Sequence, residues 1–457
     1  MPLITHLHAV FPHHFRSMNN SCSNFADRCD LYICNFPYNK FGIIETRGAK
    51  NAALPMIMYS FIHDTCDIRL GNVPDIADVQ STLDMLEAMG GQYEFDRKQG
   101  NLRITHGITH NQIPAELIRQ TRISVLLMSI LLAKFGSVLF PTEVGGCKIG
   151  TRNLDYHLDA FRSLGCDIHE TVGCIRITQR EDVPAKTTIA FPCPTTTGTA
   201  NAIILASNTK SETTVENAHL RTEVLELISF MRQCGCDISI ENGNIVVNDG
   251  TDQRIKHVSK TVRSDLEETL TYLSLGYVTD STIKVQFSNP YTFEEISFMK
   301  ELARGTLDQD GQGLMQHPFS PEQRHDMVTL ETGPYPQIGS DSQPILSALL
   351  LHMAKKFRVV DHRFSDRFSH IEHFKAYNIL VEKVENRVEV SSPRNRSDCN
   401  TVCELEAQNL RCAISALLTA SYFQQPVLLR NAHYMQRGYS NIFENLETLG
   451  FTTSIVS

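Results

Sequence analysis

The chain has 457 residues, of which 42% are apolar and 20% are charged. This ordinary composition excludes intrinsic disorder, and the length predicts two domains of roughly 200 residues each. The formal net charge of −9 excludes broad nucleic-acid binding, which needs a basic face, but a few inward-pointing arginines could still bind a small anionic substrate.

Residues 1–30 precede the first predicted strand and contain His6, His8, His13 and His14. These histidines could bind a metal, but an untethered and poorly ordered N-terminal extension is the preferred interpretation. No basic region followed by a clean apolar stretch is present, so we expect no secretory signal.

Six stretches of the sequence share one form, an amphipathic helix that ends in an apolar–Gly turn and is usually followed by a short alternating strand. A left-handed helix end favours Gly or Asn at the turn. The six helices are expected at residues 79–90, 154–165, 224–235, 293–305, 371–378 and 442–450, with turn residues Gly90, Gly165, Gly235, Gly305, Asn378 and Gly450.

The spacing of these turns indicates an internal repeat, since successive turn residues are 75, 70, 70, 73 and 72 positions apart. Units of about 70 residues are too long for solenoid repeats such as tetratricopeptide or ankyrin units. The near-constant spacing predicts six βαβαββ-type units, three to a domain, rather than the helix–Gly–strand segments common in any α/β protein. Further strand–helix pieces are expected at residues 122–135 and 199–207.

The apolar runs and cysteines bear on cellular location. The longest apolar runs, Ile123–Ala133 and Pro344–Met353, are too short to span a bilayer, so we expect no membrane segment. The 13 cysteines form no regular framework, and no pair has a second pair at zinc-ribbon spacing. We therefore predict free, mostly buried thiols without structural zinc, in a cytoplasmic protein.

Common catalytic signatures are absent from the sequence. It contains no Walker A loop, H-E-x-x-H or G-x-S-x-G motif, and no complete G-x-G-x-x-G follows a predicted strand. The usual nucleotide, protease and hydrolase signatures therefore point to no function here. The candidate site residues are those that stand beside glycines in predicted loops.

The first candidate is the pair Lys50-Asn51, in the stretch RGAKNAALP of residues 47–55. It opens a helix directly after a strand that is predicted to end near Thr46. A helix N-terminus favours anions and the lysine adds a point charge there, so an anion site is predicted. A surface lysine at a helix start is the alternative.

The second candidate is Cys147, in the stretch VGGCKIGTR of residues 144–152. Three glycines within six positions predict a flexible loop that is suited to a lid over substrate. Positive charges at Lys148 and Arg152 favour the thiolate form. The pattern predicts a reactive thiol, as against an inert buried one.

Two further candidates follow irregular, glycine-containing segments. Asp341 comes after the Pro- and Gly-rich residues 332–340 and stands at the start of an apolar helix, either as a plain N-cap or as a general base. Arg437, between Gln436 and Gly438, could bind a phosphate or carboxylate through two hydrogen bonds, or be a solvated surface residue.

Taken together, these stretches resemble the UDP-N-acetylglucosamine 1-carboxyvinyltransferase family, from about Leu31 to the C-terminus. The strongest matches are GAKNAALP at residues 48–55, NVPD at residues 72–75, and the glycine-flanked Cys147 with the residues that follow it. Single residues that stand at family positions are Arg122, Arg152, Asp155, His157, Asp341, Arg411 and Arg437.

The resemblance implies a two-domain α/β fold, in which each domain is an inside-out α/β barrel built from three of the six repeats. Residues 31–49 and 264–457 would form one domain, and residues 50–263 would form the other, which carries the Cys147 loop. The chain would cross between them near residues 262–265. A monomer or weak oligomer is expected.

The resemblance also implies addition–elimination chemistry with phosphoenolpyruvate as donor and a uridine nucleotide as acceptor. Asp341 would take the proton of the acceptor hydroxyl, Cys147 would protonate the methylene carbon of phosphoenolpyruvate and could form a covalent adduct with it, and elimination would expel phosphate. No metal or organic cofactor is implied, and fosfomycin would alkylate Cys147. The donor site would comprise Lys50, Asn51, Arg122, Arg152, Arg411 and Arg437, with Lys50 also catalytic, and the nucleotide site Arg152, Asn153, Leu154, Asp155, His157, Thr196 and Gly198.

The chain departs from the family pattern at residues 196–200, where Ser-Val-Gly-Ala-Thr becomes Thr-Thr-Gly-Thr-Ala. Because this loop is implied to bind the nucleotide phosphates, the departure bears on the identity of the acceptor. Positions at which the family tends to have an acidic residue are occupied here by Arg221, Asn409 and Gln436.

The leading hypothesis is transfer of the enolpyruvyl group of phosphoenolpyruvate to the 3-hydroxyl of UDP-N-acetylglucosamine, in peptidoglycan precursor synthesis. One alternative is a paralogue that uses another nucleotide, such as UMP in a nucleoside-antibiotic pathway. Another is a non-catalytic binding protein on the same scaffold, motivated by Asn409 and Gln436. The related shikimate-pathway enzyme is disfavoured, because the cysteine loop resembles the sugar-nucleotide branch.

Overall fold

The computed structural model describes residues 28–143, 154–248, 257–287, 294–364, 367–392 and 402–456. The chain divides into two compact units. Unit 1 comprises the residues up to Thr46, Leu266–Gly333 and the residues from Gln337 onward, and unit 2 comprises Arg47–Asp265 and Pro334–Pro336.

The described residues of unit 1 form three four-stranded sheets. The strands of the first sheet are, in order across it, β21 (Cys403–Glu406), β22 (Val427–Arg430), β1 (Asp30–Asn35) and β23 (Thr452–Val456). Those of the second are β15 (Leu307–Asp310), β16 (Gly313–Gln316), β14 (Thr282–Gln286) and β2 (Phe41–Glu45). Those of the third are β17 (His325–Thr332), β18 (Ala354–Asp361), β20 (Arg387–Ser391) and β19 (Leu380–Val384). The helices are α9 (Leu266–Val278), α10 (Glu294–Ala303), α11 (Gln343–Met353), α12 (Glu372–Ala376), α13 (Leu410–Phe423) and α14 (Ile442–Thr448), with 3₁₀ turns η2 (Pro321–Gln323), η3 (Ser369–Ile371) and η4 (Ala432–Arg437).

In unit 2, the part of the chain that the structure describes forms two four-stranded sheets and one sheet of three strands. These are β11 (Ile238–Glu241), β12 (Asn244–Val247), β10 (Glu212–Glu216) and β9 (Lys186–Ala190); β13 (Val258–Thr261), β3 (Thr65–Gly71), β5 (Asn101–His106) and β4 (Gln92–Asp96); and β6 (Ser137–Pro141), β8 (Cys174–Gln179) and β7 (Cys166–Thr171). The helices are α2 (Lys50–Ser60), α3 (Ala77–Ala88), α4 (Ala115–Ile118), η1 (Arg122–Leu126), α5 (Leu127–Phe135), α6 (Asp155–Ser163), α7 (Thr196–Ala206) and α8 (Thr222–Gln233).

The six sheets confirm the six predicted repeats, three in each unit. In every four-stranded sheet the first two strands of the repeat run parallel, as β9 and β10 or β17 and β18 do. The third strand is antiparallel to the second, and the outermost strand is antiparallel to the third, as β20 is to β18 and β19 is to β20. The sheet of β6, β7 and β8 has no parallel pair among the described residues.

At the two places where the chain passes between the units, the strand before the crossing pairs with a strand far away in the sequence. The strand β2 precedes α2 in the chain but pairs in parallel with β14 of unit 1, and β13 precedes α9 but pairs in parallel with β3 of unit 2. Where the chain enters and leaves unit 2, Gly48 bridges Ser264 and the Ala49 N–H donates to the Arg263 carbonyl at 2.6 Å. A β-carbon at Gly48 would lie 1.9 Å from the Asn72 carbonyl oxygen, so only glycine fits directly before α2.

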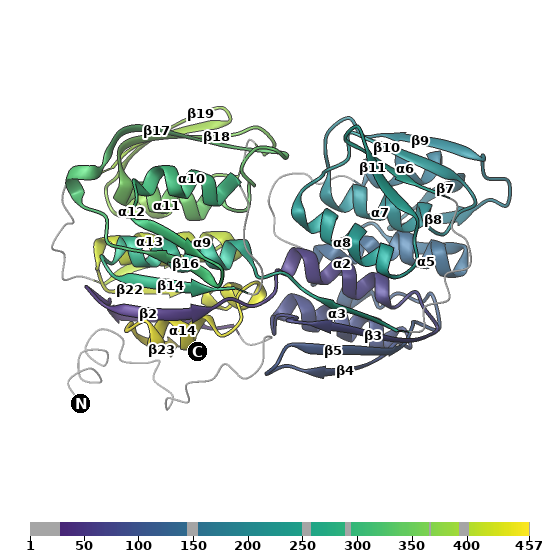
Figure 1. Ribbon diagram of the computed structural model, residues 1–457, viewed down its shortest axis with the longest axis horizontal. Coiled ribbons are helices and arrows are strands. Elements are labelled where there is room, and N and C mark those ends of the chain that lie inside the picture. Colours follow the sequence, from purple (N-terminus) through teal and green to yellow (C-terminus); the bar gives the residue numbers. More distant parts are fainter. Residues whose placement is uncertain are drawn as a thin grey trace. The chain divides into compact units, whose positions relative to one another are not determined.

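Apolar helices of each unit are enclosed by its sheets, which is the predicted inside-out arrangement (Figure 1). Every residue of α11 and α13 is buried, and so are residues 52–60 of α2 and 198–206 of α7. A helix that is apolar all round must be buried on all sides, whereas the repeat helices such as α8 bury one face only. Within the described part of the chain, no helix is long and apolar enough to cross a membrane.

Nine cysteines have described side chains, and all of them are free thiols. Five of these are buried, in agreement with the predicted buried thiols. The buried ones are Cys29, Cys166, Cys234, Cys236 and Cys412.

The six predicted turn residues all have positive φ, which confirms the left-handed helix ends. The φ angle is +89° at both Gly90 and Gly235. These two glycines differ in their surroundings, because a β-carbon at Gly90 would lie 2.0 Å from Thr109 Oγ1 whereas one at Gly235 would meet nothing within 4 Å.

This difference predicts unequal costs for the same substitution in the same unit. Gly235→Ala should lower the free energy of unfolding by about 1–2 kcal/mol, the cost of a left-handed alanine. Gly90→Ala should cost about 1–3 kcal/mol more, because Thr109 must also move. Urea denaturation of the two variants measures both values, and equal losses would contradict the predicted clash at Gly90.

Candidate active site

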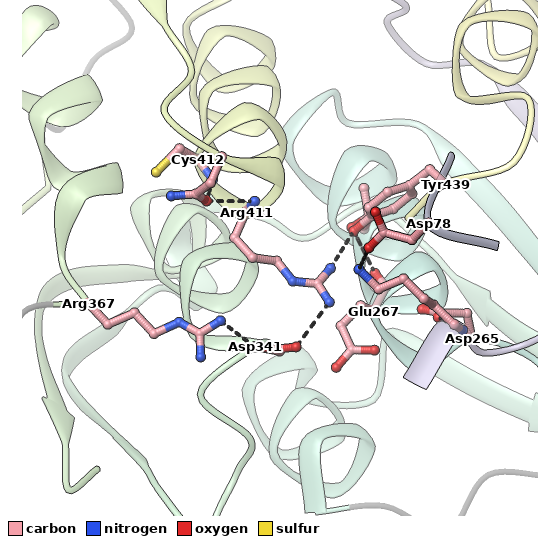
Figure 2. A network of polar contacts seen from close by, with 11 residues as sticks. Asp78, Asp265, Glu267, Asp341, Arg367, Arg411, Cys412 and Tyr439 are labelled. Carbon is pink, nitrogen blue, oxygen red and sulfur yellow. Dashed lines mark hydrogen bonds and ion pairs between the residues drawn. The ribbon is translucent and has the colours of Figure 1, made fainter. Parts of the chain in front are cut away.

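In unit 1, the carboxylate of Asp341 lies between two guanidinium groups at the start of α11. The N-cap of α11 is the next residue, Ser342, so the interpretation of Asp341 as a plain N-cap is wrong. Asp341 Oδ1 pairs with Arg367 Nη2, and Asp341 Oδ2 lies 3.4 Å from Arg411 Nη2 (Figure 2). The Asp341 side chain is 34% exposed, whereas those of Arg367 and Arg411 are 7% and 9% exposed. The arginines thus fix a carboxylate that a ligand can still reach.

Arg411 is itself held by the residues around the start of α13. Its Nη1 donates to Tyr439 Oη at 3.5 Å, and the same hydroxyl lies 2.8 Å from Thr271 Oγ1. Asn409 is the N-cap of α13, where its Oδ1 accepts from the backbone N–H groups of Arg411 and Cys412, each at 3.0 Å. Asparagine therefore supplies a normal cap at the position where the family tends to have an acid, without adding a negative charge.

Arg367 was not identified from the sequence, although the repeat contains a signal for it. It stands four residues before Ile371, where the fifth predicted repeat helix begins, and Arg437 stands five residues before Ile442, where the sixth begins. Comparing the repeats with one another would have marked Arg367 as the counterpart of Arg437. In the structure its guanidinium also lies over the ring of Phe364, 5.5 Å from the centroid.

Arg437 ends η4 and is half-buried beside the start of α13. The loop packs closely there, since a β-carbon at Gly438 would lie 2.6 Å from Leu410 Cδ2. The side chain of Gln436 has a buried Oε1 without a hydrogen-bond partner among the described residues. The proposed donor-site role of Arg437 stays a prediction.

In unit 2, Lys50 is the first residue of α2, as predicted. Its backbone N–H donates to Asp265 Oδ2 at 3.2 Å, and its ammonium lies 3.3 Å from Asp78 Oδ2. The Lys50 side chain is 15% exposed, so the alternative of a surface lysine is wrong. One carboxylate leaves an ammonium with protons for further acceptors. Asn51, the next residue, is half-buried.

Asp78 was also missed from the sequence. It lies in the first turn of α3, where an acidic residue is common because the helix dipole favours it. Nothing in the local sequence distinguishes such a residue from a partner for a lysine 28 positions earlier. Only the fold brings the two side chains together.

The predicted nucleotide residues of unit 2 lie at the starts of α7 and α6. Thr196 opens α7, and its Oγ1 lies 3.0 Å from His219 Nδ1. Gly198 is buried in the first turn, where a β-carbon would lie 2.3 Å from Thr195 Cγ2. The helix α7 thus begins with tightly packed backbone and a half-buried hydroxyl.

His157 is buried, unlike Leu154 and Asp155, its predicted neighbours at the start of α6. Leu154 is the N-cap of α6, and Asp155 is its exposed first residue. His157 Nδ1 lies 2.8 Å from Asn201 Nδ2, which donates to it. Burial, followed by the charge of Arg122 at the start of η1, lowers the pKa of His157 to about 3. His157 is therefore neutral, and its contact with a nucleotide stays a prediction.

This depressed pKa predicts acid sensitivity of the fold. Between about pH 6.5 and about pH 3 the unfolded chain takes up a proton at His157 that the folded chain does not. The free energy of unfolding should then fall by about 1.4 kcal/mol for each pH unit, per such histidine. Burial also lowers the pKa of His63 to about 4 and that of His370 to about 3, so these add to the slope.

The variant His157→Gln, whose amide oxygen can accept from Asn201, tests this prediction. The free energy of unfolding is measured at pH 7, 6 and 5 for the variant and the original chain. Below about pH 6.5 it should fall less steeply with pH in the variant, by the contribution of one proton, about 1.4 kcal/mol for each pH unit. Equal slopes would contradict a neutral, buried His157 in the folded state.

Three predicted site residues, Cys147, Arg152 and Asn153, lie outside the described residues. Their roles stay predictions. Among the residues that the structure does describe, no three His, Cys, Asp or Glu side chains group closely enough to hold a metal ion.

Comparison with known proteins gives consistent matches along nearly the whole chain. A sequence model of the family described as EPSP synthase (3-phosphoshikimate 1-carboxyvinyltransferase) matches residues 39–446. The UDP-N-acetylglucosamine 1-carboxyvinyltransferase of a Nitratiruptor species is 27% identical over 413 residues, which cover 90% of this chain and 95% of the relative. The UDP-N-acetylglucosamine 1-carboxyvinyltransferase 1 of Legionella pneumophila (strain Lens) is 29% identical over 423 residues, covering 91% and 80%.

Two solved structures share the fold. The enolpyruvyl transferase NikO from Streptomyces tendae superposes with a TM-score of 0.83 at 20% identity, over 94% of this chain and 99% of that one. The EPSP synthase from Acinetobacter baumannii superposes with a TM-score of 0.70 at 16% identity, over 94% of this chain and all of that one.

Proposed function

Because the chain belongs to the EPSP synthase family of carboxyvinyl (enolpyruvyl) transferases, we propose that it transfers the enolpyruvyl group of phosphoenolpyruvate to the 3-hydroxyl of UDP-N-acetylglucosamine. The family makes the chain a transferase of carboxyvinyl groups. The choice of acceptor is supported by the names of the relatives from Nitratiruptor and Legionella, which match most of the chain.

The observation that carries the proposal is the setting of Asp341. Its carboxylate is anchored by Arg367 and Arg411, yet it stays one-third exposed at the start of a buried helix. A general base needs this combination of fixed orientation and access to the proton that it removes. A carboxylate that served only to neutralise buried arginines would not need the exposure.

In the proposed reaction, Asp341 accepts the proton of the acceptor hydroxyl while the oxygen of that hydroxyl bonds to C2 of phosphoenolpyruvate. Cys147 gives a proton to the methylene carbon, which becomes a methyl group. Loss of one methyl proton and of inorganic phosphate then restores the double bond in the product. Cations hold the phosphate and carboxylate of the donor throughout, and the candidates are Lys50, Arg122, Arg152, Arg411 and Arg437.

A second acceptor, another nucleotide such as UMP, is kept as the alternative because of one feature of unit 2. The loop that would bind nucleotide phosphates reads Thr-Thr-Gly-Thr-Ala at residues 196–200, where the family has Ser-Val-Gly-Ala-Thr. Phosphate release from phosphoenolpyruvate with UDP-N-acetylglucosamine, UMP or shikimate 3-phosphate separates the candidates. Release with UDP-N-acetylglucosamine is expected; release with UMP alone would replace the acceptor, and release with none would favour a binding protein.

The proposed proton donor can be tested chemically. We expect fosfomycin to alkylate Cys147, because Lys148 and Arg152, which are close in the sequence, favour the thiolate form that opens the epoxide. Mass spectrometry of tryptic peptides should show the adduct on the Cys147 peptide and not on that of Cys193, a half-buried thiol of the same unit. An unmodified Cys147 in folded protein with nucleotide present would contradict its role as a reactive thiol.

A further inference from the structure

His219 has partners for both ring nitrogens at the start of α7. It lies in the loop between β10 and α8 and is 7% exposed. Its Nδ1 lies 3.0 Å from Thr196 Oγ1, and its Nε2 accepts a hydrogen bond from the backbone N–H of Tyr335 at 3.4 Å. Tyr335 is in the segment Pro334–Pro336, which is part of unit 2 like the other two residues.

These two contacts fix the direction of the hydrogen bond to Thr196. A ring nitrogen that accepts from an N–H carries no proton, so a neutral His219 has its proton on Nδ1. Nδ1 therefore donates to Thr196 Oγ1. The reverse direction would leave both ring nitrogens without a proton, which is an imidazolate. The hydroxyl hydrogen of Thr196 must consequently point to a partner other than His219.

The position of His219 is set by a second contact on the same helix. Its backbone N–H donates to Thr199 Oγ1 at 3.1 Å, and Thr199 is fully buried. Thr196 and Thr199 are three residues apart on α7, so both hydroxyls face the loop. At the beginning of the loop, Asn217 Nδ2 donates to the Phe191 carbonyl at 2.7 Å. The imidazole is thus held against the first turn of α7.

We propose that His219 is a positioning residue that keeps the Thr196 hydroxyl as a hydrogen-bond donor toward a phosphate oxygen of the acceptor. This inference rests on the proposed function, which assigns nucleotide phosphates to Thr196 and Gly198. A phosphate oxygen only accepts hydrogen bonds, so it is complementary to a hydroxyl whose oxygen is already occupied by an N–H. If the hydroxyl were free to rotate, the entropy cost of ordering it on binding would reduce the affinity for the phosphate.

Two substitutions separate the ring nitrogens of His219. In His219→Asn the amide nitrogen stands near the place of Nδ1 and can still donate to Thr196. In His219→Gln the amide oxygen stands near the place of Nε2 and can still accept from Tyr335, but the donor to Thr196 is lost. The proposal predicts that His219→Gln weakens acceptor binding at least about tenfold, as expected for a hydrogen bond to a charged group, whereas His219→Asn stays within about threefold.

The hydroxyl itself is tested by Thr196→Val, which should weaken acceptor binding about as much as His219→Gln. In the Thr196→Val background, His219→Gln should have no further effect, because it acts through the missing hydroxyl. The KM for phosphoenolpyruvate should stay unchanged in all variants. Thr209→Val, which removes a hydroxyl bonded to the Ala206 carbonyl at the other end of α7, is the matched control and should leave acceptor binding unchanged.

Binding is measured by calorimetry with UDP-N-acetylglucosamine, UMP and inorganic pyrophosphate, so that the result does not depend on turnover. Additive effects of His219→Gln and Thr196→Val, or equal losses in His219→Gln and His219→Asn, would overturn the role of His219. If a phosphate compound binds with this pattern but no acceptor supports phosphate release, the proposed function fails and the His219 inference stands. If the unmodified chain binds none of the three, both are contradicted.

Discussion

Replacement of Asp341 by asparagine is expected to lower kcat for phosphate release by about 10²–10⁴-fold, the usual contribution of a positioned general base. The amide keeps the shape and one acceptor oxygen for Arg367 or Arg411, but it cannot take a proton. The KM for phosphoenolpyruvate should change by no more than a few-fold. A steady-state phosphate-release assay with saturating acceptor measures both constants.

The matched control for this variant is Asp30→Asn, in β1 of the same unit. Asp30 pairs with Arg430 at 2.6 Å and accepts from the Asn431 N–H at 2.8 Å, and its side chain is 23% exposed. Loss of this charge should lower Tm to a similar degree as loss of Asp341 does, without changing kcat. Equal kcat in Asp341→Asn and the unmodified chain would exclude Asp341 as the base.

The substitution Lys50→Met should lower kcat/KM for phosphoenolpyruvate by about 10²–10³-fold, the loss found when one preorganised donor to a developing charge is removed. Methionine keeps the length and the apolar part of the side chain. It leaves Asp78 without the ammonium 3.3 Å away, so a negative carboxylate then faces the anionic donor. Lys50→Arg should restore little, because a planar guanidinium does not fit the place of a compact ammonium.

Lys134→Met provides the comparison, because Lys134 is a second mostly buried lysine of unit 2. Its ammonium donates to the Ile62 carbonyl at 2.7 Å and lies 2.5 Å from Asp64 Oδ1. Removing it should lower stability, since a buried carbonyl loses its donor. It should not change KM for phosphoenolpyruvate. Similar kinetic losses in Lys50→Met and Lys134→Met would mean that Lys50 acts only through stability.

The repeat architecture could be predicted from the sequence because it depends on local patterns. Amphipathic helices and left-handed turns can be recognised from residues that are close together in the sequence. Each of the six turns has the predicted positive φ. The strand exchange of β2 and β13 could not be derived from such patterns, because each of these strands pairs with a partner far away in the chain. That part of the fold came from the resemblance alone.

The candidate site shows the same division between local and long-range information. Lys50 and Asp341 stood out because they follow glycine-containing segments at helix starts. Asp78, the partner of Lys50, has nothing in its local sequence that marks it, and Arg367 could be found only by comparing the repeats. Folding places these two residues beside Lys50 and Asp341. His219 could not be identified from the sequence either, because its role depends on which hydroxyl of α7 its ring contacts.

The central claim, addition–elimination transfer to a nucleotide hydroxyl, is tested most directly by product analysis in D₂O. The chain is incubated with phosphoenolpyruvate and UDP-N-acetylglucosamine, and the nucleotide product is analysed by mass spectrometry. The account predicts an enolpyruvyl ether that carries deuterium in its methylene group, because that carbon passes through a methyl group before phosphate leaves. An enolpyruvyl product without deuterium, or no nucleotide product at all from folded protein, would contradict it.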